Sequence, residues 1–268
     1  MQVKGRLALI KKIHYCWFGS AVPEAVAKNV QAWQQLNPGY EIRQWNDHNT
    51  DVSEFAYGRR ARENKRWGFV ADIVRLQKLY EEGGFYFDTD VELLRPLDGL
   101  ANEGDFLILG YMYECSLGTA VIYSPARHPM LAKVLEETHH VREDCWPVNN
   151  TIFTDYFINR VPGFLVNGRR WKSDQQRISV YPKEFFEQPA FFRRKAMALH
   201  HFTGSWMPKN VGAAFQIDTG SGGLAHKLRW AKRKVRTFCA MLISQYRTAY
   251  LWALLGRRVQ KHSWWRKN

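Results

Sequence analysis

Cysteine is scarce and scattered in this sequence. The four cysteines are Cys16, Cys115, Cys145 and Cys239, and no two of them form a CxxC pair. Zinc sites and redox motifs need such paired spacings, and disulfide frameworks need a denser set in an oxidising compartment. The pattern therefore predicts the reduced thiols of a cytosolic protein and argues against a zinc site or a disulfide scaffold.

A secretory leader, internal repeats and low-complexity linkers are also missing. The opening stretch MQVKGRLALIKKIHYCWFG carries four basic residues, and its apolar part is too short for a signal peptide. Of the 268 residues, 46% are hydrophobic, which is enough to bury the core of one α/β domain with an appendage. We therefore expect a single folded body.

Negative charge is missing from the last fifth of the chain. No Asp or Glu follows Asp218, whereas twelve Lys and Arg residues do, and the whole chain has a net charge of +14. Residues 1–218 are therefore close to neutral. This asymmetry predicts a catalytic or binding body, residues 1–222, and a basic amphipathic helical tail, residues 223–268, that meets an anionic surface.

Apolar spacing in the body predicts alternating strands and helices. Strands are expected at 7–19, 40–46, 85–87, 105–112 and 117–123, helices at 23–36, 66–84 and 129–139, and a late strand and loop at 197–206. Residues 141–195 give no clear pattern. The β-α-β start predicts an α/β fold whose sheet is mixed, mostly parallel and covered by helices.

The stretch GGFYFDTDVELL, residues 83–94, places two carboxylates directly after a hydrophobic strand. Asp88 and Asp90 are two residues apart, so in a regular strand their side chains share a face and repel each other. A divalent cation removes this conflict, and oxygen ligands suit Mg²⁺ or Mn²⁺. A solvated strand end is the plain alternative, but the helix, the Gly-Gly stop and the aromatic strand before it favour a metal site.

Three motifs in this order resemble glycosyltransferases of family 32: KKIHYCWFG, WGFVADIVRLQKLYEEGGFYFDTDVELLRPLD and LHHFTGSW. These are DXD-containing sugar transferases of capsule and surface-polysaccharide loci, and their relatives include the clostridial glucosylating toxins and the yeast outer-chain mannosyltransferase. The resemblance covers residues 11–98 and 197–206, matches 100–195 loosely and leaves out the tail. It implies a GT-A-like, Rossmann-type nucleotide-sugar-binding fold, a nucleotide-sugar donor, a divalent metal (usually Mn²⁺) and retention of anomeric configuration.

The resemblance also implies a metal site. Asp90 would ligate the metal directly, and Asp88 would bind the ribose or donor sugar or support the metal through water. His201, in HFTG, would complete the ligand set, although a hydrogen-bonded core histidine is the plain alternative. The neighbouring His200 would then be structural.

Two charged residues interrupt the apolar stripe of the predicted helix 66–84. Asp72 and Arg75 are three residues apart and share a helix face. An exposed pair of this kind has little energetic value, but charges in a buried helix are paired or used. The resemblance assigns Asp72 to donor-sugar hydroxyls and Arg75 to sugar or phosphate oxygens.

Three further positions complete the expected donor site. Trp17 follows the first strand, where its indole can stack on uracil or guanine for roughly 1–3 kcal/mol, with a core tryptophan as the alternative. Ser205 and Trp206 resemble a loop that closes over the diphosphate and excludes water. Asn149 and Asn150 are assigned to the acceptor side.

These features together predict a metal-dependent retaining glycosyltransferase. It would move a hexose from a nucleotide-diphosphate sugar, UDP in preference to GDP, to a hydroxyl of a lipid-linked glycan acceptor in capsule, O-antigen or lipopolysaccharide biosynthesis. Two alternatives stay open: a metal-dependent phosphohydrolase or nucleotidyltransferase, and a basic nucleic-acid-binding protein. Against the first, the sequence shows neither further clustered carboxylates nor a basic Gly-rich phosphate loop. Against the second, it shows no helix-turn-helix, RNA-recognition or zinc signature.

The tail, residues 224–262, predicts one long helix or a pair of helices. Its second part is apolar, but Gln245 and Arg247 lie near the middle, and a central Arg costs about 2.5–3.5 kcal/mol on insertion scales. Tryptophans among Lys and Arg are typical of a membrane–water boundary. We therefore expect peripheral binding to the cytoplasmic face of the inner membrane, with packing of the apolar face on the body as the alternative.

Overall fold

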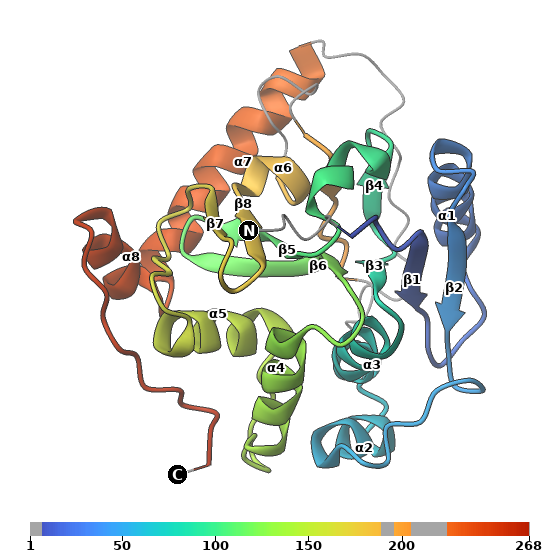
Figure 1. Ribbon diagram of the computed structural model, residues 1–268, viewed down its shortest axis with the longest axis horizontal. Helices are drawn as coiled ribbons and strands as arrows, with labels where there is room; N and C mark the ends of the chain where they lie inside the picture. The colour runs from blue at the N-terminus through green and yellow to red at the C-terminus, as the bar shows by residue number, and fades with distance from the viewer. Residues whose placement is uncertain (1–6, 189–195, 205–223, 268) are drawn as a thin grey trace, which may run out of the picture.

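The computed structural model describes residues 7–188, 196–204 and 224–267. Its centre is a seven-stranded sheet in the order β2-β1-β3-β6-β5-β8-β7 (Figure 1). The strands are β1 (Lys12–Cys16), β2 (Glu41–Trp45), β3 (Gly84–Phe87), β5 (Leu107–Tyr113), β6 (Ser116–Ser124), β7 (Trp171–Ser173) and β8 (Ile178–Tyr181). β6 and β7 run opposite to the other five. The expected mixed, mostly parallel sheet is therefore confirmed.

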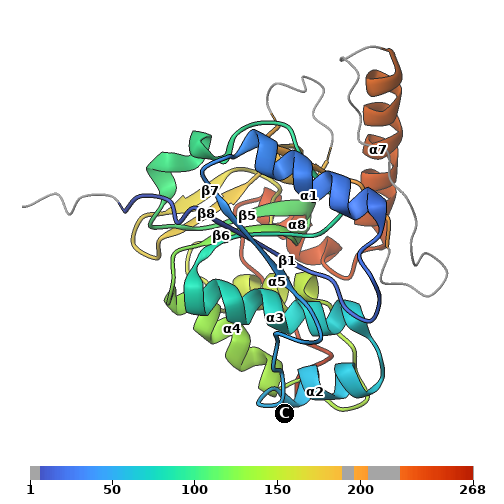
Figure 2. The ribbon, with the colours of Figure 1, turned by 90° about the vertical axis from the view of Figure 1, so that its right-hand side faces the viewer.

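Helices cover both faces of this sheet (Figures 1 and 2). One face carries α2 (Ala56–Glu63), α3 (Trp67–Glu82), α4 (Pro129–His139) and α5 (Asn149–Arg160). The other carries α1 (Glu24–Leu36), the 3₁₀-helix η1 (Leu97–Glu103), α6 (Lys183–Phe186) and a small sheet of β4 (Val91–Leu93) and β9 (Ala198–His200). The alternation of β3 serves both cores, since Phe85 and Phe87 face α1 and Tyr86 faces α3.

The central helix α3 fixes the position of the site. Its apolar residues, among them Ile73, Leu76 and Leu79, are fully buried, and it ends where the sequence predicted, at Gly83. Gly83 has a φ of 69°, and a Cβ there would lie 2.6 Å from the Ala126 nitrogen. Only glycine fits this turn without strain, so α3 stops abruptly and the chain enters β3 at once.

Residues 141–188, the described part of the segment 141–195, hold α5, β7, β8 and α6, which the sequence pattern did not show. In α5, buried residues include Asn149, Thr154 and Asp155 beside the aromatic ones, so polar and apolar side chains do not separate onto two faces. A helix buried on most sides gives no clean period of 3.6 residues.

The tail forms a pair of helices, α7 (Leu224–Ile243) and α8 (Arg247–Leu254). α8 docks on the body through Tyr246, Ala249 and Ala253, which are buried. The indole Nε1 of Trp265 donates to Asp155 Oδ2 at 2.7 Å. Within the residues that the structure describes, no helix is long and apolar enough to cross a membrane.

Candidate active site

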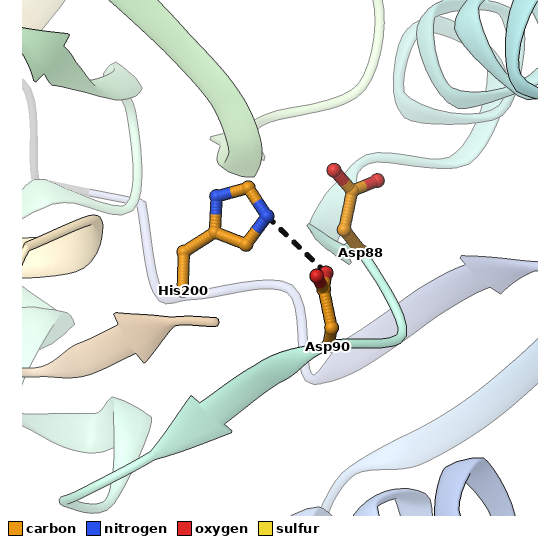
Figure 3. A group of neighbouring side chains, drawn as sticks. All are labelled: Asp88, Asp90 and His200. Atoms are coloured by element: carbon orange, nitrogen blue, oxygen red, sulfur yellow. Dashed lines mark ion pairs between the residues drawn. The ribbon is translucent and has the colours of Figure 1, made fainter. Parts of the chain in front are cut away.

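The two aspartates of the DXD motif lie on a turn rather than within a strand. β3 ends at Phe87, and the Val91 amide donates to the Asp88 carbonyl at 3.0 Å, which closes the turn. The expected shared strand face is therefore not how the carboxylates meet. The turn brings Asp88 and Asp90 together with His200, and one ligand atom from each lies within 4.8 Å of the others (Figure 3).

Asp90 is held on both carboxylate oxygens. Oδ1 lies 3.2 Å from His200 Nε2, and Oδ2 accepts from the Thr203 amide at 2.8 Å and from its hydroxyl at 2.9 Å. Burial alone would raise the pKa of Asp90, but His200 and the Thr203 donors outweigh it and hold the pKa well below its usual range. Asp90 is therefore a fixed, ionised carboxylate in the turn, directly before β4.

His200 rather than His201 joins the two aspartates. His200 is the last residue of β9 and pairs with Val91, whereas His201 Nε2 lies 3.0 Å from Glu92 Oε2. The expectation gave the ligand role to His201 and a structural role to His200, but in the structure it is His200 that lies with Asp88 and Asp90, whereas His201 faces Glu92. Neighbouring side chains along an extended chain point to opposite sides, so only one of the two can face Asp90.

His200 lies between two carboxylates. Its Nδ1 lies 2.7 Å from Glu187 Oε2, and its ring stacks on Phe202 with a centroid separation of 4.0 Å. Burial acts to lower the pKa of His200, but Asp90 and Glu187 raise it well above its usual range. Because Glu187 occupies Nδ1, Nε2 is the ring nitrogen that faces Asp90.

Arg75 links the helix to the DXD motif. Its Nη2 lies 3.2 Å from Asp72 Oδ1 and 3.1 Å from Asp88 Oδ1, and its Nη1 donates to the Thr119 carbonyl at 2.7 Å. Its guanidinium also lies over the Tyr86 ring, 4.4 Å from the centroid. Arg75 is thus buried, with its donors directed to the protein, and it fixes the orientation of both aspartates.

Asp72 is the most perturbed acid that faces Arg75. Burial is the largest effect and raises the pKa of Asp72 to about 6, although Arg75 and the Asn149 amide oppose it. That amide belongs to the first residue of α5 and donates to Asp72 Oδ2 at 3.1 Å. The N-terminus of α5, which is the positive end of the helix dipole, therefore faces the Asp72 carboxylate and favours its negative charge.

The two asparagines that were assigned to the acceptor side have different surroundings. Asn149 is fully buried and donates its side-chain amide to the Asp72 carbonyl at 2.7 Å. Asn150 lines the cavity, and its Oδ1 accepts from the Thr119 hydroxyl at 2.8 Å. Asn149 therefore supports α3, and only Asn150 can meet a bound molecule.

A cavity of about 460 Å³ unites these groups. Its lining includes five of the expected site residues, Trp17, Asp72, Arg75, Asp88 and Asp90, together with His200. This volume falls in the range of small-molecule sites. Trp17 is partly exposed, with its indole Nε1 bonded to the Ala21 carbonyl at 3.1 Å. Ser205 and Trp206 lie outside the described residues.

The donor chemistry of the cluster fits a divalent cation. Two carboxylates and one imidazole form the mixed oxygen and nitrogen set that Mn²⁺ accepts, and they leave positions for phosphate oxygens. Asp88 and Asp90 would supply oxygen, and His200 would supply Nε2. Sequence reasoning missed Thr203 and Glu187, which hold Asp90 and His200, because their roles depend on contacts between distant segments.

Residues 23–107 match the family described as "Glycosyltransferase sugar-binding region containing DXD motif". The match contains Asp72, Arg75, Asp88 and Asp90 in one segment. This part of the chain therefore resembles the DXD-containing sugar-binding region of glycosyltransferases, in agreement with the predicted class.

Two curated proteins are similar to part of the chain. One is the subversion of eukaryotic traffic protein A of Legionella pneumophila, 30% identical over 113 residues, which cover 32% of this chain and 18% of that protein. The other is an uncharacterized protein of Arabidopsis thaliana, 29% identical over 120 residues, with 43% and 17% covered. The chain thus spans less than a fifth of the length of these relatives.

Two solved glycosyltransferases show a distant structural similarity to this chain. The PaToxG glycosyltransferase gives a TM-score of 0.47 at 19% identity, with 58% of this chain and 71% of that chain covered. GlyE of Streptococcus pneumoniae gives 0.45 at 11% identity, with 94% and 66% covered.

Proposed function

We propose that this protein transfers a sugar from a nucleotide-diphosphate donor to an acceptor hydroxyl with the help of a divalent cation. The observation that carries the proposal is the Asp88–Asp90–His200 cluster, which lies beside Asp72 and Arg75 in one 460 Å³ cavity. The match of residues 23–107 to a DXD-containing sugar-binding region supports the same chemistry.

Each residue of the cavity then has a definite task. A cation on Asp88, Asp90 and His200 would neutralise the charge that develops on the leaving diphosphate. Arg75 orients Asp72 and Asp88 instead of contacting phosphate, because its Nη donors point to these carboxylates and to Thr119. Each Asp72 oxygen keeps a second acceptor position, which can take a hydroxyl of the donor sugar.

We propose retention of configuration without a carboxylate nucleophile. Among the described residues, the carboxylates that line the cavity are Asp72, Asp88, Asp90 and Glu187, and each is held by Arg75 or His200. A carboxylate fixed in an ion pair is a poor nucleophile toward an anomeric carbon. Same-face attack assisted by the leaving phosphate fits this arrangement better.

The donor is proposed to be a UDP sugar in preference to a GDP sugar, and Mn²⁺ is the expected cation. Trp17 lines the cavity and is partly exposed, so its indole is available to stack on the base. The acceptor is proposed to be a lipid-linked glycan of a surface polysaccharide, reached from the cytoplasmic face of the inner membrane. The charge asymmetry between body and tail motivates that location.

Incubation with a panel of nucleotide sugars tests the proposal. With Mn²⁺, one UDP sugar should be hydrolysed slowly and transferred when a glycan acceptor is added, and EDTA should stop both reactions. Release of phosphate from plain nucleotides with no sugar transfer would indicate the phosphohydrolase alternative. Tight binding of an oligonucleotide, with no turnover of any nucleotide sugar, would indicate a nucleic-acid-binding protein.

A further inference from the structure

The tail helices expose a continuous set of large apolar side chains. On α7, Leu228, Val235, Phe238 and Leu242 are 61%, 66%, 58% and 42% exposed. Their spacing of seven, three and four residues places them on one side of the helix. We call these four residues the tail apolar face. Leu251 in α8 and Leu255 directly after it are 51% and 72% exposed and extend the apolar surface.

The tail is seated on the body by other residues. One side of α8 is buried against the body, as Ala253 and Tyr246, the residue that precedes the helix, show. The Tyr246 hydroxyl donates to the Thr151 carbonyl at 3.2 Å. On α7, Lys234 Nζ lies 2.7 Å from Glu184 Oε1. Figure 2 shows α7 standing along the side of the body, with its N-terminal half projecting from it. The body therefore accounts for one side of the tail and leaves the tail apolar face outward.

The charges around this face specify its partner. After Asp218 the sequence contains twelve Lys and Arg residues and no acid. Lys232, Arg247 and Arg257 are exposed, and Arg257 lies 5.3 Å from the centroid of the Trp252 ring. Exposed aliphatic and aromatic side chains in the same segment as exposed bases fit the boundary of an anionic bilayer, where headgroups meet the bases and acyl chains meet the apolar groups.

We propose that the tail apolar face docks on an anionic lipid bilayer, with α7 lying in the plane of the interface. A spanning arrangement is not implied, because no described helix is long and apolar enough to cross a membrane. Docking on the tail would hold the cavity of the body near a lipid-linked acceptor. The inference concerns a surface separate from the cavity, so it stands or fails independently of the proposed transfer reaction.

Sedimentation with vesicles tests the proposal on the full chain. The protein should bind phosphatidylglycerol-containing vesicles and should bind neutral phosphatidylcholine vesicles much less. The triple substitution V235S/F238S/L242S should weaken binding at least about tenfold, since each side chain loses part of its apolar transfer free energy. Leu7→Ser is the matched control, because Leu7 is 61% exposed on the body, and it should bind like the unchanged protein.

Charge is tested in the same assay. K232Q and R257Q should each weaken binding about fivefold at low salt, while Lys133→Gln, an exposed lysine on α4, should have little effect. Equal binding of the triple variant and the unchanged protein would overturn the inference. The inference would also be overturned if the unchanged protein bound no vesicles but formed a dimer in ultracentrifugation, and if the triple substitution abolished that dimer. The tail apolar face would then join two copies of the chain. Substitutions are preferred to truncation, because truncation also removes the buried Trp265.

A different observation concerns the carboxylate behind His200. Glu187 follows α6, is 1% exposed and lines the cavity. Its Oε2 lies 2.7 Å from His200 Nδ1, and its Oε1 has no hydrogen-bond partner among the described residues. Gly118 in β6 makes room for it, because a Cβ at that position would lie 2.1 Å from Oε1.

We infer that Glu187 is a positioning residue for the metal site, an inference that rests on the proposed metal dependence. By holding Nδ1, Glu187 turns Nε2 of His200 toward Asp90 and Asp88. A carboxylate that bonds the far nitrogen of a ligating histidine fixes the ring and strengthens the ligand. Gly118 has the matching role, since only a residue without a side chain leaves the space that Glu187 fills.

Mn²⁺ affinity without donor, measured by electron paramagnetic resonance of the free ion, tests this role. E187Q and G118A should each weaken Mn²⁺ binding about 10–100-fold. Glu184→Gln is the control, because Glu184 pairs with Lys183 and Lys234 and does not line the cavity. Unchanged Mn²⁺ affinity in a folded E187Q protein would overturn the role of Glu187 alone. An unchanged chain that binds no Mn²⁺ would overturn the metal site as well.

Discussion

The cavity of the body and the tail handle charge in opposite ways. Around the cavity, Asp72, Arg75 and Asp90 are buried and fixed by specific partners within 3.3 Å. In the tail, basic residues are exposed, and large apolar side chains are exposed beside them. Buried charge is expensive unless it is paired, so its retention indicates a site that uses it. A large exposed apolar surface also indicates function, because such a surface is typically covered by a binding partner.

The largest expected effect comes from breaking the buried cluster. Asp90→Asn keeps the shape of the side chain but removes the charge that Asp90 would present to a cation. We expect sugar transfer to fall by at least about 10³-fold, or about 4 kcal/mol in the activation barrier. The measurement is donor turnover with Mn²⁺, and circular dichroism should show an intact fold. Asp98→Asn, on the surface near Lys11, should leave turnover unchanged. Transfer that persists in Asp90→Asn and in EDTA would remove the metal from the mechanism.

Stability separates buried from exposed pairs. Arg75→Met leaves Asp72 and Asp88 without their shared cation, and breaking a buried ion pair of this kind costs about 3–5 kcal/mol. Lys28→Ala removes the pair with Glu24, whose side chains are 66% and 81% exposed, and should cost no more than about 0.5 kcal/mol. Urea unfolding of both variants gives the comparison. Similar losses in the two variants would mean that burial does not distinguish these pairs.

The parts of the fold and of the candidate site that could be predicted are those whose sequence signals are local. Helices α1, α3 and α4 begin and end within about two residues of their predicted bounds, because apolar spacing, Pro129 and Gly83 are local signals. Trp17, Asp72 and the two DXD aspartates converge on one cavity, as the resemblance implied. In contrast, the choice between His200 and His201 depends on the pairing of β9 with β4, which no local pattern reveals. Glu187 was missed for the same reason, since it follows α6, whereas its partner His200 belongs to β9 and Gly118, which makes room for it, belongs to β6.

A moderate effect is expected at the entrance of the cavity, where Trp17 is partly exposed. Trp17→Ala should weaken the binding of free UDP by about 1–3 kcal/mol, or roughly 5–150-fold, if the indole stacks on the base. Calorimetry with UDP and GDP on the unchanged protein and the variant gives the result for each nucleotide. Trp252→Ala, in the tail, is the matched control and should leave nucleotide affinity unchanged. If Trp17→Ala binds both nucleotides as tightly as the unchanged protein does, the base does not stack on Trp17.

The smallest effect is a pH dependence of stability at a buried histidine away from the cavity. His14 Nδ1 faces the Trp45 indole nitrogen at 3.1 Å, and its Nε2 lies 2.8 Å from the Gly83 carbonyl. Because an indole only donates, Nδ1 must accept and Nε2 must carry the single proton. Burial is the largest influence and lowers the pKa of His14, although the Gly83 hydrogen bond opposes it.

The sign of this effect follows from the lowered pKa. Neutral His14 contributes its full share to the free energy of unfolding when the pH is above about 6.5, the pKa of histidine in the unfolded chain. This contribution is lost as the pH falls toward the lower pKa that His14 has in the folded protein. One proton limits the slope to about 1.4 kcal/mol per pH unit. Urea unfolding between pH 7.5 and about pH 5 should therefore show a decline that His14→Gln reduces. His128, whose pKa burial also lowers, supplies a matched comparison through His128→Gln. If the decline is as steep in both variants as in the unchanged protein, acid sensitivity arises elsewhere than at these buried imidazoles.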